Sequence, residues 1–299
     1  MGEKTIRINE HFLSIQGEGR FTGKSSYFVR VFSCNLRCPG FGLKPGETNT
    51  EIPAIIQRID QYRTLKDLPL SETGCDSYPA SWPEFKRFAT DYTYQQLVET
   101  IKLDCGEDPT GIDLVITGGE PLIKGTQNKL AELFDTYHDY FSKFDSITFE
   151  TNGTQTIQPA MIEYLANKFT GPVVFSISPK LACSGEPQEK TIKPEAIQSI
   201  KDAVSVIKQH RSNDFDIANT QLYLKFVVTN QNDVDEINDV ANKLNFVNHV
   251  DGDIYLMPCG GTFEQHNRNA KAVAELAIKH RMLFCYRVHC AVWRNDWSR

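Results

Sequence analysis

The residues of this chain best suited to chemistry are three cysteines in two separate polar stretches. Cys34 and Cys38 are separated by three residues and come directly after an apolar run that ends at Phe32, and Cys75 follows an excursion over residues 39–74. Three thiolates could hold three irons of a four-iron cluster and leave the fourth iron open for another ligand. The first two lie where a strand should give way to a loop, which is where such a cluster could be reached.

The choice of Cys75 as third thiol follows from Phe41, which occupies the place where a compact C-x3-C-x2-C pattern would have its last cysteine. The alternative is Cys105, at a predicted helix end and without the Asp-Ser pair that follows Cys75. Closing a long loop is tolerable, since its cost rises by only about 0.6 kcal/mol per doubling of length. We expect residues 39–74 to loop out and bring Cys75 beside Cys38. The remaining cysteines are expected to be buried small hydrophobes, namely Cys105, Cys183, Cys259, Cys285 and Cys290.

Composition indicates an ordinary globular protein. The 299 residues are 40% hydrophobic and 23% charged, and 32 Lys and Arg against 38 Asp and Glu leave a formal charge of -6. That balance gives no basic surface for a nucleic acid. No apolar run reaches the length of about 18 residues needed to span a membrane, and the first residues lack the apolar core of a signal peptide. Eight cysteines in such a chain favour metal binding or chemistry over disulfides. We expect a cytoplasmic protein.

The chain alternates strands and helices from about residue 93 onward. Predicted strands cover 112–116, 146–149, 173–177, 222–228, 253–257 and 283–288, and predicted helices cover 93–103, 128–140, 160–169, 194–209, 234–244 and 264–280. With the run at 27–32 this makes about seven strands. Crossovers of this length produce a parallel sheet. The predicted fold is α/β, a partial (β/α) barrel forming one domain over residues 1–299, with an insertion at 39–74.

The insertion has a pattern of its own. Ile52, Ile55, Ile56, Ile59 and Tyr62 follow helical spacing, so it should contain an amphipathic helix packed on the body. The aromatic patch that comes after Cys75 is expected to be core or a lid over a site, and consists of Tyr78, Trp82, Phe85 and Phe88.

Polar residues follow the predicted strands where each one ends. Parallel strands end at the same edge, where barrel enzymes assemble their sites, so Cys34, Glu120, Glu150 and Lys180 should converge. Gly118 and Gly119 before Glu120 would let a ligand lie against bare backbone. Arg30, charged inside an apolar strand, is explained equally well by a salt bridge across the sheet or by a clamp on an anionic ligand.

These motifs, taken in order, resemble the radical S-adenosylmethionine enzymes and more narrowly the 7-carboxy-7-deazaguanine synthase family. The resemblance rests on residues 14–19 (SIQGEG), 28–38 (FVRVFSCNLRC), 75–77 (CDS) and 117–121 (TGGEP), and continues through 150–154, 178–180, 224–228 and 257–258. The set covers most of the chain outside the insertion. Each element alone is weak evidence, whereas the ordered set is specific.

The resemblance implies a role for each matched residue. The cluster ligands would be Cys34, Cys38 and Cys75. S-adenosylmethionine would be held by Gly118, Gly119, Glu120, Glu150, Asn152, Ser178 and Lys180. The substrate, 6-carboxy-5,6,7,8-tetrahydropterin, would be bound by Gln16, Glu18, Arg30, Thr117 and His289. Without the resemblance, His289 would be read as a core or surface histidine. Mg²⁺ would bind Ser77, where the family more often has threonine with the same hard oxygen donor.

The implied reaction is the ring contraction of the pterin to 7-carboxy-7-deazaguanine with loss of ammonia, in the biosynthesis of 7-deazapurines such as queuosine. In the family a 5′-deoxyadenosyl radical takes a hydrogen from C6 of the pterin and later returns it. The resemblance also implies a homodimer and an electron donor such as a flavodoxin or ferredoxin. Two other hypotheses remain: an activase that places a glycyl radical on a protein, and a binding or regulatory protein on the same fold whose divided cysteine motif holds no cluster, supported by Phe41 and the insertion.

Overall fold

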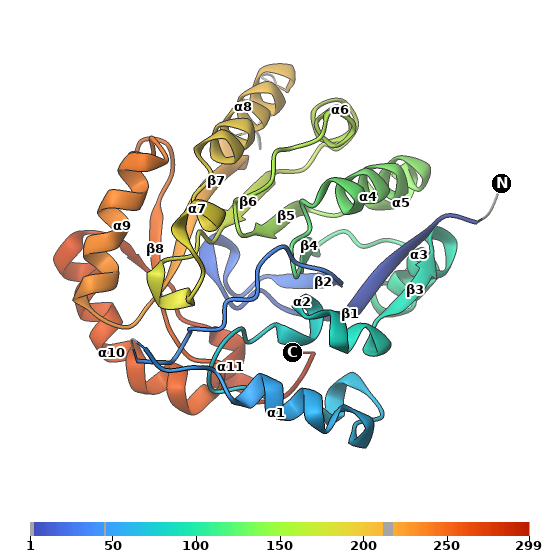
Figure 1. Ribbon diagram of the computed structural model, residues 1–299. Helices are drawn as coiled ribbons and strands as arrows, with labels where there is room; N and C mark the ends of the chain where they lie inside the picture. Colours follow the sequence, from blue (N-terminus) through green and yellow to red (C-terminus); the bar gives the residue numbers. More distant parts are fainter. Residues whose placement is uncertain (1–2, 45, 212–217, 299) are drawn as a thin grey trace.

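A curved sheet forms the centre of the computed structural model, which describes residues 3–44, 46–211 and 218–298 (Figure 1). Within these residues the sheet has nine strands in the order β3-β1-β2-β4-β5-β6-β7-β8-β9. The strands are β1 (Thr5–Ile15), β2 (Ser25–Val31), β3 (Thr90–Thr93), β4 (Asp113–Gly118), β5 (Ser146–Thr151), β6 (Val173–Ile177), β7 (Gln221–Val228), β8 (Ile254–Pro258) and β9 (Leu283–Phe284). The sheet is open, because its two edge strands, β3 and β9, do not pair with each other.

Helices cover the convex outer face of the sheet (Figure 1). They are α3 (Tyr94–Cys105), α4 (Lys124–Thr136), α5 (His138–Phe141), α6 (Pro159–Asn167), α8 (Pro194–His210), α9 (Gln231–Lys243) and α10 (Phe263–His280). Each long helix buries one apolar stripe against the strands, as in α8, where Ile197, Ile200, Val204 and Ile207 are buried. None of the helices in the described residues is both long and apolar enough to cross a membrane.

The predicted strand–helix alternation is present, and β2, β4, β5, β6, β7, β8 and β9 pair in parallel. Two features differ from the prediction. The amino-terminal strand β1 runs antiparallel to both β2 and β3, which adds a hairpin to the parallel sheet. The last predicted strand, 283–288, ends at Phe284 and is followed by the short helix α11 (Val288–Trp293). Short helical segments also lie between these elements: η1 (Gly19–Phe21), α2 (Tyr78–Ser81), η4 (Pro83–Phe88), η5 (Ala182–Ser184) and α7 (Gln188–Thr191).

The insertion packs around a small apolar core separate from the main one. Its helix α1 (Glu51–Gln57) is shorter than the predicted pattern, and η2 (Ile59–Gln61) and η3 (Leu65–Asp67) follow it. The buried members of this core are Ile52, Ile55, Leu68, Tyr78 and Phe85, with Trp82, Phe88 and Trp297 packed against them. The aromatic patch after Cys75 therefore serves as core. In Figure 1 the insertion lies at the open side of the sheet, near the carboxyl terminus.

Candidate active site

A cavity of about 290 Å³ opens at the carboxyl ends of the parallel strands. Nearly all of the residues expected to form a site line it together: Gln16, Glu18, Arg30, Cys34, Cys38, Cys75, Ser77, Thr117, Gly118, Gly119, Glu150, Asn152, Ser178, Lys180 and His289. Glu120 does not. Most of the lining residues meet because the parallel strands β2, β4, β5 and β6 all end at this edge, so loops far apart in the sequence are neighbours in space.

The three thiols line one part of this cavity, and every cysteine in the chain is unbridged. Burial raises the pKa of the Cys38 thiol well above its usual value; the nearby Cys75 and Cys34 raise it further, while Lys180 opposes them. Burial likewise raises the pKa of Cys75 to about 12. Such thiols become thiolates when a metal binds and displaces their protons. All three cysteines line the same cavity, as the ligands of one four-iron cluster must.

A single metal ion makes a different demand, because its ligands must converge on one point. Among the residues that the structure describes, no three His, Cys, Asp or Glu side chains gather in that way. In a site-differentiated cluster each thiolate binds its own iron. The donor set of Cys34, Cys38 and Cys75 therefore fits an iron–sulfur cluster by the chemistry of its ligands.

The two ends of the insertion are joined beside the cavity, and this returns Cys75 to it. The amide of Gly74 donates to the carbonyl of Phe41 at 2.7 Å. The Glu51 carboxylate accepts hydrogen bonds from the Glu72 amide at 2.7 Å and the Thr73 hydroxyl at 2.8 Å, which ties the start of α1 to the segment that leads back to Cys75. Phe41 itself lines the cavity, with the Lys180 ammonium 5.9 Å from the centre of its ring.

Gly118 and Gly119 are required by backbone packing, a reason different from the ligand contact that the sequence suggested. A Cβ on Gly118 would lie 2.2 Å from the Val31 carbonyl oxygen, and one on Gly119 would lie 2.1 Å from that of Ser33. The end of β4 therefore presses directly on the start of the loop that carries Cys34. Only glycine permits this approach.

Glu120 is completely buried behind these glycines. Its carboxylate accepts hydrogen bonds from the Thr151 hydroxyl at 2.7 Å, the Asn152 amide at 2.7 Å and the Leu122 amide at 2.9 Å. Burial raises its pKa, while these bonds oppose the shift. In this structure Glu120 thus joins the ends of β4 and β5.

The residues after β5 and β6 form the wall beside the thiols. The Asn152 side-chain amide donates to Asn35 at 3.0 Å and lies 3.9 Å from the Cys34 sulfur. The Lys180 ammonium donates to the Ser178 hydroxyl at 2.9 Å. These polar groups, with the Lys180 ammonium among them, suit the carboxylate and hydroxyls of an amino-acid or nucleoside ligand.

Gln16 and Glu18 reach the cavity from the opposite end of the sheet. Their turn follows β1, which is antiparallel to β2, so Ile15 pairs with Ser25 at the beginning of β2. Gly17 allows the turn to pack against α11, since a Cβ there would lie 1.9 Å from the His289 ring nitrogen Nδ1. The turn therefore forms a floor, while the loops after the parallel strands form the walls.

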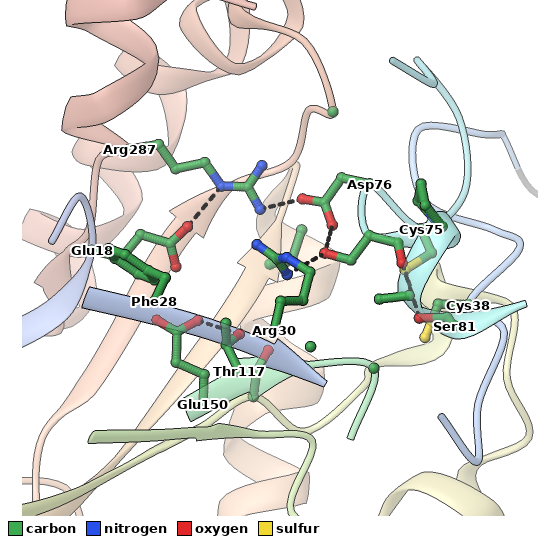
Figure 2. A pocket seen from close by; sticks show the side chains of 18 of the residues that line it. Glu18, Phe28, Arg30, Cys38, Cys75, Asp76, Ser81, Thr117, Glu150 and Arg287 are labelled. Carbon is green, nitrogen blue, oxygen red and sulfur yellow. Dashed lines mark hydrogen bonds and ion pairs between the residues drawn. The ribbon is translucent and has the colours of Figure 1, made fainter. Parts of the chain in front are cut away.

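Two cations that sequence reasoning did not assign hold this floor. Lys225, buried in the middle of β7, pairs with the Glu18 carboxylate, and the Arg287 Nε–H donates to the same carboxylate at 3.0 Å. Burial alone would raise the pKa of Glu18, but the two cations outweigh it and lower it well below its usual value. Arg287 also lies 2.5 Å from Asp76 (Figure 2). The available signal was Lys225 itself, a charge inside the apolar run of residues 222–228.

Arg30 makes a salt bridge across the sheet and also lines the cavity. Its Nε–H donates to Glu10 at 2.8 Å across the β1–β2 pair, which is the salt bridge, and Nη1 donates to the Ser77 hydroxyl at 3.2 Å while the side chain lines the cavity. Below it, the Thr117 hydroxyl donates to Glu150 at 2.8 Å (Figure 2). Arg30 thus has one cross-strand partner and an edge that faces the cavity.

The carboxyl-terminal residues complete the lining, from Arg294 to Ser298. The indole N–H of Trp297 donates to the Leu68 carbonyl at 2.9 Å, and the Ser298 hydroxyl donates to Glu10 at 2.9 Å. The end of the chain is therefore fastened both to the insertion and to β1. Sequence reasoning assigned no role to this segment.

The fold is that of a radical S-adenosylmethionine enzyme, with the three thiols placed after the first parallel strand and at the return of the insertion. It matches QueE from Escherichia coli with a TM-score of 0.51 and 18% sequence identity, over 94% of this chain and 93% of that one. At this identity the likeness establishes the fold.

Sequence comparison then defines the particular relatives. No protein-family model matches the chain. The 7-carboxy-7-deazaguanine synthase of Halobacterium salinarum is 29% identical over 306 residues, covering 97% of this chain and 91% of the relative. That of Rhodopirellula baltica is 28% identical, covering 98% and 88%. The chain is a homologue, over nearly its whole length, of the 7-carboxy-7-deazaguanine synthases.

Proposed function

We propose that this protein is a 7-carboxy-7-deazaguanine synthase, which contracts the ring of 6-carboxy-5,6,7,8-tetrahydropterin to 7-carboxy-7-deazaguanine and releases ammonia. The observation that carries the proposal is the meeting of three unbridged thiols and a charged floor in one cavity, in a chain homologous to these synthases throughout. The [4Fe-4S] cluster and S-adenosylmethionine supply the radical chemistry when bound. The protein supplies position and charge.

The thiols of Cys34, Cys38 and Cys75 would hold the cluster. Gly118, Gly119, Asn152, Ser178 and Lys180 would bind S-adenosylmethionine beside it, where the Lys180 ammonium suits a carboxylate. We assign Glu120 an indirect part, because its carboxylate is already bonded to the residues that carry Asn152. Mg²⁺ would bind the hydroxyl of Ser77, which faces the cavity.

The substrate would lie on the floor formed by the turn after β1. The carboxylate of Glu18, with Gln16, Thr117 and His289, suits the amide and amino groups of a pterin. The cations Arg30, Lys225 and Arg287 suit the carboxylate of the pterin. Since Lys225 and Arg287 keep Glu18 ionised, it is an acceptor for ring N–H groups throughout the physiological pH range. Walls on all these sides would exclude water from a reactive intermediate.

We further propose that the protein works in a reducing, cytoplasmic compartment, which its eight unbridged cysteines support. We propose a homodimer and an electron donor such as a flavodoxin or ferredoxin, as in the family that the sequence resembles.

The test is direct. The protein is reconstituted anaerobically with iron and sulfide, and supplied with reductant, S-adenosylmethionine, Mg²⁺ and the carboxylated pterin. We expect 7-carboxy-7-deazaguanine to form, and Cys34→Ala, Cys38→Ala and Cys75→Ala to abolish it, while Cys105→Ala, with a half-buried thiol outside the cavity, retains it. A fully loaded enzyme that forms no product would refute the assignment. Consumption of S-adenosylmethionine that depends on a protein and not on the pterin would point to an activase.

A further inference from the structure

The loop between the first two cysteines is held by a carboxylate from a distant part of the chain. One oxygen of Glu186, Oε1, accepts a hydrogen bond from the Arg37 amide at 2.6 Å and another from the Cys38 amide at 2.9 Å. Glu186 lies in the segment that follows β6 and η5. A single carboxylate thus binds the two successive peptide groups on either side of Arg37.

This loop needs such support because its backbone is unfavourable. Cys38 has a φ of 47° and Ser33 a φ of 107°, both in the region that L-residues other than glycine rarely adopt. Conformations of this kind cost of the order of 1–3 kcal/mol and persist only where surrounding contacts enforce them. The hydrogen bonds of Glu186 are contacts of that kind, since charge-assisted bonds to amides are among the stronger ones.

The neighbouring residues dock the same two segments together. The Gly40 amide donates to the Ser184 carbonyl at 2.8 Å. A Cβ on Gly40 would lie 2.6 Å from the Gly185 nitrogen, so the backbones are in direct contact. The segment 184–186 is therefore fitted along residues 37–40 by backbone and side-chain bonds together.

Glu186 also places a carboxylate beside a cluster ligand, since its Oε1 lies 2.9 Å from the amide nitrogen of Cys38. A negative charge beside an iron–sulfur cluster disfavours the uptake of an electron, and local charge is one determinant of cluster potentials. Its effect is therefore expected on the cluster itself.

We propose that Glu186 is a positioning residue of the iron–sulfur site, which fixes the Cys38 loop through two amide hydrogen bonds and lowers the reduction potential of the cluster by its charge. This inference rests on the cluster of the proposed function. It does not depend on which substrate the enzyme takes.

Two variants separate geometry from charge. Glu186→Gln keeps an oxygen that can accept both amide hydrogens but removes the charge, whereas Glu186→Ala removes both. Glu189→Gln and Glu189→Ala, at an exposed position on α7, are the matched controls. After anaerobic reconstitution, iron and sulfide per chain are measured, together with the electron paramagnetic resonance spectrum of the reduced cluster and its midpoint potential.

We expect Glu186→Ala to hold severalfold less iron than its control, and Glu186→Gln to hold as much iron as the unchanged protein but with a more positive midpoint potential. Circular dichroism would reveal whether Glu186→Ala misfolds. In that case the midpoint potential of the cluster in Glu186→Gln is the deciding measurement for the proposal. Equal iron in Glu186→Ala and Glu189→Ala would overturn the positioning role, and an unchanged potential in Glu186→Gln would overturn the role of the charge. If the protein without substitutions binds no iron, both this inference and the proposed function are refuted. If it binds a cluster but makes no 7-carboxy-7-deazaguanine, only the proposed function is refuted.

Discussion

Arg287 and Glu18 are ion-paired across 269 positions of the chain, with 3.0 Å between Nε and Oε1. The same guanidinium lies 2.5 Å from Asp76, the residue after Cys75, and donates to the Gly260 carbonyl at 3.1 Å beyond the end of β8. Arginine suits this place because its planar fork offers several donors at once. One side chain thus connects the floor of the cavity to the segment that carries the third thiol.

Replacing Arg287 should therefore loosen both parts. In Arg287→Met two carboxylates lose a largely buried cation. Breaking a fully buried pair costs about 3–5 kcal/mol, and the cost here should be smaller because the Asp76 side chain is 36% exposed. We expect a lower free energy of unfolding in urea and at least a tenfold weaker affinity for the pterin. Arg287→Lys keeps the charge but has no planar fork to reach both carboxylates. Its free energy of unfolding and its affinity for the pterin should lie between those of the unsubstituted protein and of Arg287→Met. The control is Arg268→Ala, exposed on α10, and similar values for it and Arg287→Met would contradict the bridging role.

Gly119 should tolerate no side chain. In Gly119→Ala the new Cβ would lie 2.1 Å from the carbonyl oxygen of Ser33 and 2.9 Å from that of Ala80. Both are backbone atoms, which cannot move without displacing the segments that they belong to. We expect the loop that carries Cys34 to be displaced, so that iron binding falls along with stability. In Gly125→Ala, on α4, the Cβ meets nothing within 4 Å, so that variant should be neutral or slightly more stable. The measurements are iron content and thermal unfolding of Gly119→Ala and Gly125→Ala. Equal iron content in the two variants would show that the close contact between Gly119 and Ser33 does not matter for cluster binding.

The carboxyl-terminal segment should stabilise the insertion through Trp297. Trp297→Phe keeps an aromatic ring but loses the hydrogen bond to Leu68, which is worth about 1 kcal/mol. We expect faster amide hydrogen exchange over residues 46–74. Trp82→Phe is the control, because the buried Trp82 indole N–H has no hydrogen-bond partner among the described residues, so that its removal breaks no bond seen there. Exchange rates that change equally in both variants would argue against a role of the terminus.

His266 should make the protein sensitive to mild acid. It is completely buried, with one ring nitrogen 3.1 Å from the Pro258 carbonyl and the other accepting the Arg287 amide at 3.1 Å, an arrangement that needs the neutral ring. Burial, assisted by the charge of Arg287, lowers its pKa to about 4, although Glu18 opposes the shift. The unfolded chain therefore binds a proton more readily than the folded one does.

It follows that the stability contributed by His266 is complete above pH 6.5 and is lost as the pH falls toward 4, by up to ~3 kcal/mol. Urea unfolding at a series of pH values would measure it. His266→Gln should flatten this slope, whereas His210→Gln, exposed at the end of α8, should leave it unchanged. A slope that survives in His266→Gln would assign the acid sensitivity to other groups.

Much of the architecture was predictable because it follows from local patterns. The apolar runs and helical periods after residue 93 correspond to β4 through α10, with ends that differ by a few residues. The helix in the insertion ends earlier than its apolar spacing predicts. It stops at Gln57, because Arg58 leaves the helical conformation with a ψ of 16° and the chain continues in a separate 3-10 turn. Apolar spacing continues through such a turn and does not reveal it.

The charged floor was not predictable for a different reason. Lys225 stands out as a charge inside an apolar run, but the sequence does not show its partner or that of Arg287. Their shared partner Glu18 is brought in from the far end of the sheet because β1 runs antiparallel to β2. An antiparallel strand and a parallel strand look alike in sequence when each has one apolar face. The direction of β1, and with it the position of the turn, is a property of the whole sheet.

By itself the sequence determined which residues meet at the carboxyl edge of the sheet, because the ends of parallel strands share an edge whatever their separation along the chain. Only the tertiary structure decided how Cys75 returns, through the Phe41–Gly74 hydrogen bond, and why Gly119 must be glycine, through its contact with Ser33. These are contacts between segments with no common period or spacing. They arise from the close packing of the folded chain, which no local pattern records.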